Sequence, residues 1–150
     1  MAKRQPGKDF SWLKPIQFTG YYQCFENSFP VSISVGGIAY PSVEHAFQAA
    51  KVSDAFLKHN ISKIESLSEV SELLKDVPVR PNWEEVKYAT LEQLMNLKFE
   101  ASRKCKDVLV STGARRLVSP KDAMIGKILT KIRNEFTKRG YQQKPGQLYQ

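Results

Sequence analysis

The stretch YPSVEHAFQAAK, residues 40–51, has the pattern of a helix that begins behind a proline and carries one polar stripe. Ser42 is placed to cap it, because a serine oxygen accepts hydrogen bonds from first-turn N–H groups. Glu44, Gln48 and Lys51 recur on one side. At roughly 1.5 Å rise per residue, Glu44 and Lys51 are about 10 Å apart along that side. The gap is too long for an ion pair and wide enough for part of a ligand. The alternative is an ordinary solvent-exposed helix face, on which an acid in the first turn interacts favourably with the helix dipole.

The composition favours one globular chain with an anionic partner. The 150 residues are 41% hydrophobic and carry a formal net charge of +8, with a pI near 9.5. This balance favours nucleic acid, a phosphorylated small molecule or a nucleotide as partner. Between positions 115 and 144 there are nine Lys/Arg against two acids. That run fits a nucleic-acid surface, and it fits a solvated basic helix equally simply.

Several other classes are disfavoured. No apolar run is long enough to cross a bilayer, and no apolar segment follows the basic start MAKRQPGK, as a secretory signal requires. The two cysteines, Cys24 and Cys105, show no metal-ligand spacing, and two histidines are few for a metal site. We therefore expect a cytoplasmic protein with no metal, no cofactor and no membrane partner.

A small strand element is expected near the start. Residues 15–25 and 29–40 have the composition of short strands, and the second alternates Val and Ile with serine before a Gly36-Gly37 turn.

The remainder of the chain has helical periodicity. Short helices joined by serines are expected over 54–76, a long helix over about 84–99 and a shorter one over about 101–110. The last helix has the clearest apolar stripe, formed by Ile125, Ile128, Leu129, Ile132 and Phe136.

The expected fold class is therefore α+β, mainly α-helical, in one compact domain. That domain is expected over residues 16–139, between a flexible basic arm (1–15) and a polar tail (140–150).

Two lysines share an apolar stripe of the long helix. Lys87, Leu91, Leu94 and Lys98 recur at helical spacing. Lysine can snorkel from such a position, and the alternative is that the ends of the stripe border a cleft that binds phosphate.

The turn RPNW places Arg80 three residues before Trp83. An arginine and an indole at this spacing could clamp a phosphate and stack on a base, although a tryptophan is also a common core residue. Near the last helix, Ser119 or Asp122 is expected as the N-cap. Glu44 and Asp122 are candidates for a carboxylate pair.

Three segments together resemble the YbiA-like N-glycosidases, the NADAR superfamily. FTGYYQCFENSFPVSISVGGIAYPSVEHAFQAAK (18–51) resembles the family's aromatic start, strand and Pro-Ser/Thr-x-Glu-His helix. The segment from RPNW to RRLV (80–118) resembles its Arg-x-x-Trp-x-x-Val-Lys segment and Lys-Phe helix. IGKILTKIRNEF (125–136) resembles its Leu-Gly-x-x-Leu-Met-x-x-Arg helix.

The resemblance implies a compact, mainly helical YbiA/NADAR-like fold and hydrolysis of N-glycosyl bonds (EC 3.2.2.-). One branch of the family cleaves phosphoribosylamino-pyrimidine intermediates of riboflavin synthesis, and another removes ADP-ribose from modified bases. The resemblance implies Glu44 and Asp122 as the acidic catalytic residues. It implies as substrate-binding residues Asn27, Lys51, Arg80 and Trp83.

Two departures from the family pattern stand out. The aromatic-Trp-Gly segment and glycine-rich loop that usually follow the late aspartate are missing after Asp122, and Ser28 separates Asn27 from Phe29. Three functions remain open. The leading one is an N-glycosidase that cleaves phosphoribosylamino-pyrimidine intermediates of riboflavin synthesis, with ADP-ribosylated nucleic acid as the alternative substrate. The others are a non-catalytic ADP-ribose or nucleotide binder and a nucleic-acid-binding module.

Overall fold

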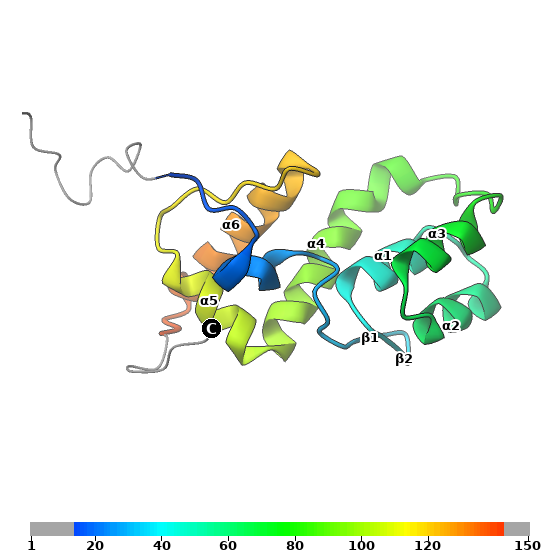
Figure 1. Cartoon of the computed structure of the whole chain (residues 1–150), viewed down its shortest axis with the longest axis horizontal. Helices are drawn as coiled ribbons and strands as arrows, with labels where there is room; N and C mark the ends of the chain where they lie inside the picture. Colours follow the sequence, from blue (N-terminus) through cyan, green and yellow to red (C-terminus); the bar gives the residue numbers. More distant parts are fainter. Residues whose placement is uncertain (1–13, 143–150) are drawn as a thin grey trace, which may run out of the picture. The chain divides into compact units, whose positions relative to one another are not determined.

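The computed structural model describes residues 14–142 and is mainly helical with one small antiparallel sheet (Figure 1). The expected α+β, mainly helical class is confirmed. The described chain divides into two compact units. The central unit is residues 26–105, and the terminal unit is residues 14–25 with 106–142.

The expected arm and tail fall almost wholly on residues 1–13 and 143–150, which lie outside the described residues. The boundaries of the domain, 16–139, stay a prediction.

The central unit begins with a β-hairpin. Strand β1 (Ile33–Val35) pairs antiparallel with β2 (Ile38–Tyr40). Gly36 and Gly37 form the turn at φ values of 57° and 82°, a left-handed conformation that glycine adopts without a Cβ clash. The turn predicted at these glycines is confirmed.

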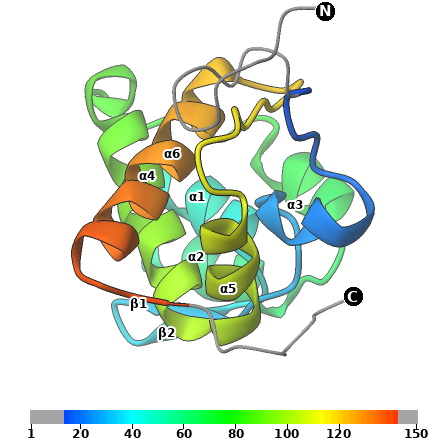
Figure 2. The ribbon, with the colours of Figure 1, turned by 90° about the vertical axis from the view of Figure 1, so that its left-hand side faces the viewer.

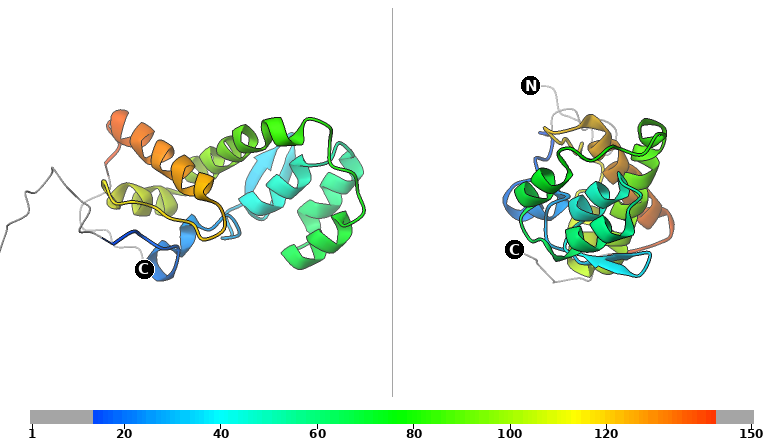
Figure 3. Two further views of the ribbon diagram at one scale, coloured as in Figure 1. Left: turned by 90° about the horizontal axis from the view of Figure 1, so that it is seen from above. Right: turned by 90° about the vertical axis from the view of Figure 1, so that its right-hand side faces the viewer.

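Four helices complete the central unit. They are α1 (Val43–Ala50), α2 (Ala55–Lys63), α3 (Leu67–Leu74) and α4 (Trp83–Ala101). The helices predicted over 54–76 and 84–99 are confirmed. Side-chain oxygens of Asp54 and Ser66 cap α2 and α3. Helix α1 packs against α2, α3, α4 and both strands, and Figure 3 shows the hairpin beside it. The polar row of α1 therefore belongs to the central element of this unit.

The terminal unit joins two distant parts of the chain. Ile16 makes an isolated parallel bridge with Leu117, and the 3-10 helix η1 (Gly20–Phe25) follows. Helix α5 (Arg103–Ser111) enters this unit at Lys106, and α6 (Ala123–Lys138) ends it. Figure 2 shows the segment between α5 and α6 leading into the start of α6.

The strand predicted over residues 15–25 is wrong. Gly20 has a φ of 57°, which turns the extended chain, and η1 follows at once. The ring of Phe25 then lies edge-on to that of Phe18, with their centroids 5.6 Å apart, and both side chains are buried. Aromatic composition suits a strand, but burial of these two rings here is achieved by a helical turn.

The apolar stripe predicted for the last helix is confirmed. Ile128, Leu129, Ile132 and Phe136 of α6 are buried, and Ile125 is half-buried. Gly126 allows the helix backbone to approach the carbonyl oxygen of Leu117, because a Cβ at this position would overlap that oxygen. This close approach fixes α6 against the segment that leads into it.

Candidate active site

A serine–histidine pair holds the N-terminus of α1. The Ser42 hydroxyl oxygen accepts a hydrogen bond from the His45 main-chain N–H at 3.2 Å and lies 2.7 Å from His45 Nδ1. The other ring nitrogen, Nε2, lies 3.1 Å from the carbonyl oxygen of Glu65. Because a carbonyl only accepts, a ring protonated at Nε2 satisfies both contacts. The cap predicted at Ser42 is confirmed, and buried His45 fixes the turn that carries Glu44.

Glu44 connects α1 to the segment that precedes the hairpin. Its main-chain N–H donates to the carbonyl oxygen of Asn27 at 2.9 Å, and its Oε1 accepts from Nε2 of Gln48 at 2.8 Å. Glu44 is half-buried, whereas Asn27 is buried. Oδ1 of Asn27 is covered and has no hydrogen-bond partner among the described residues. The structure thus brings Asn27 and Glu44 together, with Gln48 orienting the carboxylate.

The other end of α1 is tied to the turn before α4. The main-chain N–H of Arg80 donates to the carbonyl oxygen of Lys51 at 2.9 Å, and that of Trp83 donates to the Arg80 carbonyl at 3.1 Å. The Arg80 guanidinium carbon lies 5.9 Å from the centre of the Trp83 ring, at the distance of a cation–π contact. Nε of Arg80 is buried and has no hydrogen-bond partner among the described residues. This guanidinium can donate hydrogen bonds to an anionic oxygen.

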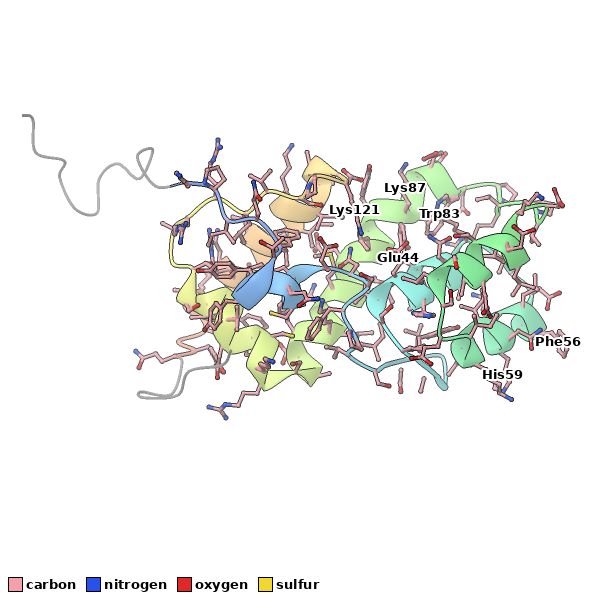
Figure 4. All side chains as sticks on the ribbon, viewed as in Figure 1. Glu44, Phe56, His59, Trp83, Lys87 and Lys121 are labelled. Atoms are coloured by element: carbon pink, nitrogen blue, oxygen red, sulfur yellow. The ribbon has the colours of Figure 1, made fainter. Side chains whose placement is uncertain are left out.

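Trp83 serves as a packing residue as well as a candidate site residue. It is buried, and its ring centroid lies 5.1 Å from that of Phe47 on α1. Figure 4 shows Trp83 at the start of α4 and Glu44 on α1. Trp83 is therefore part of the core in this structure, and its role in binding a substrate stays a prediction.

A hollow of about 250 Å³ lies beside this end of α1. Its lining consists of Gln48, Lys51, Val52, Ser71, Leu74, Val77 and Val79. The polar row of α1 therefore borders a concave surface at Gln48 and Lys51, and the stripe is more than a flat wet face. Glu44 and Trp83 are not part of this lining.

Lys98, at the end of the lysine stripe of α4, has a different role from the two that the spacing suggested, snorkelling and bordering a phosphate cleft. Lys98 is fully buried and donates from Nζ to the carbonyl oxygen of Glu26 at 2.7 Å, with the ring centres of Phe29 and Phe99 at 5.8 and 5.6 Å. Lys87 pairs with Glu84 at 2.7 Å. Lys98 neither snorkels nor borders a phosphate cleft, because it is sealed inside. No sequence signal separates these roles.

Asp122 lies in the terminal unit, where it caps α6. Its Oδ1 accepts from the N–H of Met124 at 2.9 Å, and α6 begins at the next residue, Ala123. Ser119 is not the helix cap, and its hydroxyl oxygen instead accepts from the N–H of Lys121 at 3.2 Å. Of the two predicted caps, Asp122 is correct.

Positive charge is unevenly distributed between the two units. The described residues of the terminal unit include ten Lys/Arg and three Asp/Glu, whereas the central unit has nine Lys/Arg and eleven Asp/Glu. The positive excess of the described residues is therefore concentrated in the terminal unit, and α1 belongs to the unit in which acids slightly outnumber bases.

Metal-binding clusters and membrane-spanning helices are absent from residues 14–142. Within that range no three His, Cys, Asp or Glu residues cluster as metal ligands, and no helix is both long and apolar enough to span a bilayer. Cys24 and Cys105 are buried, and neither forms a disulfide among the described residues.

Five of the six predicted site residues lie in the central unit. They are Asn27, Glu44, Lys51, Arg80 and Trp83, and main-chain hydrogen bonds join them in two groups at the two ends of α1. Residues 10–143 match the model of the NADAR domain, and the chain belongs to the NADAR domain family.

Two curated proteins are similar to this chain in sequence. It is 31% identical over 99 residues to "N-glycosidase YbiA" of Escherichia coli (strain K12), which covers 65% of this chain and 62% of that protein. It is 27% identical over 126 residues to "Riboflavin biosynthesis protein VVA0006" of Vibrio vulnificus (strain YJ016), which covers 73% of this chain and 34% of that protein. The chain thus spans less than two thirds of each of these relatives.

A solved structure shares the fold. The NMR structure of E. coli YbiA matches 88% of this chain and 90% of its own, with a TM-score of 0.72 and 24% sequence identity. The expected YbiA/NADAR-like fold is confirmed.

Proposed function

We propose that this protein is an N-glycosidase that hydrolyses phosphoribosylamino-pyrimidine intermediates of riboflavin biosynthesis, releasing ribose 5-phosphate and the free pyrimidine. The observation that carries the proposal is the α1 site. A half-buried glutamate is oriented by Gln48, and Arg80, with a buried unpaired Nε, lies beside an indole. The names of the two relatives, an N-glycosidase and a riboflavin biosynthesis protein, point to the same chemistry.

The proposed mechanism uses two carboxyl groups. As the bond between C1 of the ribose and the leaving nitrogen breaks, positive charge develops on the sugar, and the Glu44 carboxylate stabilises it and orients water. The water oxygen bonds to C1 and gives a proton to the Glu44 carboxylate, while the leaving nitrogen takes the electron pair of the broken bond and a proton from the second acid, which we assign to Asp122. Asp122 also caps α6, so in this scheme it serves both as helix cap and as acid.

Arg80 and Lys51 are proposed to hold the 5′-phosphate, and Trp83 and Asn27 to hold the base and sugar. A guanidinium binds phosphate through parallel N–H donors, and an indole face stacks on a planar ring. The main-chain bond between Lys51 and Arg80 keeps the two cations on neighbouring segments.

A second candidate is hydrolysis of ADP-ribose from guanine in nucleic acid. The positive charge of the terminal unit favours it, because such a surface attracts the phosphate backbone. A non-catalytic ADP-ribose or nucleotide binder would use the same α1 residues and release no product.

Product release followed by mass spectrometry tests these functions. Wild type, Glu44→Gln and Asp122→Asn would each receive the phosphoribosylamino-pyrimidines and, separately, ADP-ribosylated guanosine and DNA. Glu69→Gln is the matched control, since Glu69 also lies in a first helical turn but is exposed. We expect free pyrimidine from wild type and Glu69→Gln, and none from Glu44→Gln. Release from the ADP-ribosylated substrates alone would favour the second candidate, and retained ligand without product would favour the binder.

A further inference from the structure

A groove in the terminal unit, here called the α6 groove, has none of the α1 residues in its lining. It has a volume of about 460 Å³. Its lining consists of Ala114, Arg115, Arg116, Leu117, Val118, Ala123, Gly126, Lys127, Thr130 and Arg133. Gly126, Thr130 and Arg133 recur at i, i+4 and i+7, so one face of α6 forms the floor. The absence of a side chain at Gly126 permits the close approach of Leu117 that forms the wall.

Arg133 is held in this groove with donors left over. It is only 5% exposed, and Nη1 donates to Oγ1 of Thr112 at 2.9 Å and to the carbonyl oxygen of Arg115 at 2.8 Å. These bonds use Nη1 alone. Nε is buried without a hydrogen-bond partner, and Nη2 makes no hydrogen bond to the described residues. The Nε–Nη2 edge, which arginine uses for bidentate recognition of oxyanions, is therefore unoccupied.

No acidic side chain lines the groove to balance this charge, and three further cationic residues, Arg115, Arg116 and Lys127, join Arg133 in the lining. Arg116 and Lys127 are exposed at the rim, and Nε of Arg115 is buried without a partner among the described residues. Burial lowers the pKa of Arg133, because the charged form loses hydration, yet an arginine stays protonated at neutral pH. A buried cation that lacks a counter-charge is destabilising until an anion arrives.

We propose that the α6 groove binds the phosphate or diphosphate group of a small molecule, with Arg133 as the central donor and Arg116 and Lys127 at the rim. A small ligand is favoured over a nucleic-acid backbone, because the central donor is 95% covered and is reached only from within a concave surface. The volume also suits a ligand of nucleotide size. This site does not depend on the proposed glycosidase activity.

Calorimetric titration of the full chain with pyrophosphate, and with inorganic phosphate, tests the site. In an Arg80→Gln background, which removes the phosphate donor proposed on the α1 site, we expect saturable binding of one pyrophosphate per chain. Arg133→Met should abolish it. Because Arg133→Met also removes the bonds to Thr112 and Arg115, the exposed double variant Arg116→Gln/Lys127→Gln gives a second reading, with an expected loss of about tenfold or more in affinity. Lys138→Gln is the matched control, since Lys138 is an exposed lysine of α6 outside the groove lining, and it should stay within about twofold.

Each other outcome overturns the proposal. Pyrophosphate that does not saturate, or that binds the double variant as it binds wild type, would mean that the groove holds no phosphate. Binding of a single-stranded oligonucleotide with none of pyrophosphate would assign the charge to nucleic acid instead. Glu44→Gln should retain pyrophosphate affinity. Loss of product formation with intact binding therefore separates the groove from the active site.

Discussion

Gly126 of α6 lies so close to the carbonyl oxygen of Leu117 that a Cβ at this position would overlap it. Glycine inside a helix costs about 1 kcal/mol relative to alanine, so helix propensity alone would favour Gly126→Ala. We expect the opposite. The backbone of residues 117 and 118 would have to move, and overpacking of this kind costs about 1–3 kcal/mol. Urea unfolding of wild type and Gly126→Ala would measure the loss.

The control for this variant is Asn134→Ala, at an exposed position of the same helix. It should leave the free energy of unfolding unchanged or raise it slightly. If Gly126→Ala were as stable as Asn134→Ala, the close approach to Leu117 would not limit this position.

Patterns within one element predicted much of the fold, and relations between elements were out of reach. The apolar spacing of 125–136 and the cap at Ser42 need only neighbouring residues, and both are confirmed. The helical turn over 20–25 depends on where Phe18 packs, which no local pattern encodes. The burial of Lys98 depends on the Glu26 carbonyl, 72 residues away.

The candidate site was likewise predictable only where its residues lie on one helix. The residue types at Glu44 and Lys51 could be selected from one helical stripe, because they share a face of α1. The bonds that join Asn27 to Glu44 and Lys51 to Arg80 run between main-chain atoms, so side-chain identity gives no signal for them. Gln48 as the donor to Glu44 was accessible from the i, i+4 spacing, since such pairs meet on a helix.

Lys98 should be a strong determinant of stability in the central unit. Its stem fills the interior, and its ammonium satisfies the Glu26 carbonyl. We expect Lys98→Ala to lower the free energy of unfolding by about 2–5 kcal/mol, because it leaves a cavity and an acceptor without its donor. Lys98→Met keeps most of the stem, so a loss of about 1–3 kcal/mol is expected.

Denaturant unfolding of both variants separates packing from hydrogen bonding. Lys104→Ala is the control, since Lys104 is an exposed lysine of α5 and should change stability by less than about 0.5 kcal/mol. Equal stability of Lys98→Ala and wild type would contradict a sealed, bonded lysine.

Because Tyr40 is buried, we expect the free energy of unfolding to fall in alkali. Burial raises the pKa of its phenol above 10.0, because the phenolate loses hydration. Above about pH 10 the unfolded chain releases this proton while the folded chain retains it. The contribution to stability is therefore full below that pH and falls as pH rises toward the folded pKa, by at most about 1.4 kcal/mol per pH unit.

Tyr40→Phe tests this dependence, because it removes the titrating group and keeps the ring. The unfolding free energy of both proteins would be measured at pH 8 and pH 10.5. The decrease between the two values should be smaller in Tyr40→Phe. An identical decrease in both proteins would show that Tyr40 does not contribute to it.

Arg80 should contribute to substrate affinity through the phosphate. Its Nε is buried and unpaired among the described residues, and its guanidinium lies beside Trp83, so it gains a full charge-assisted bond when an oxyanion arrives. We expect Arg80→Gln to raise KM for a phosphoribosylamino-pyrimidine by about 10- to 100-fold, which corresponds to the loss of one such bond. Because phosphate binding is remote from the bond that breaks, kcat should change far less.

The same measurement with the substrate lacking its 5′-phosphate supplies the internal comparison, and there the variant and wild type should have similar KM values. Arg103→Gln, which removes an equal charge from an exposed position of α5, should resemble wild type with both substrates. An equal rise in KM for both substrates would instead make Arg80 a packing residue beneath Trp83, and the phosphate would have to be held elsewhere.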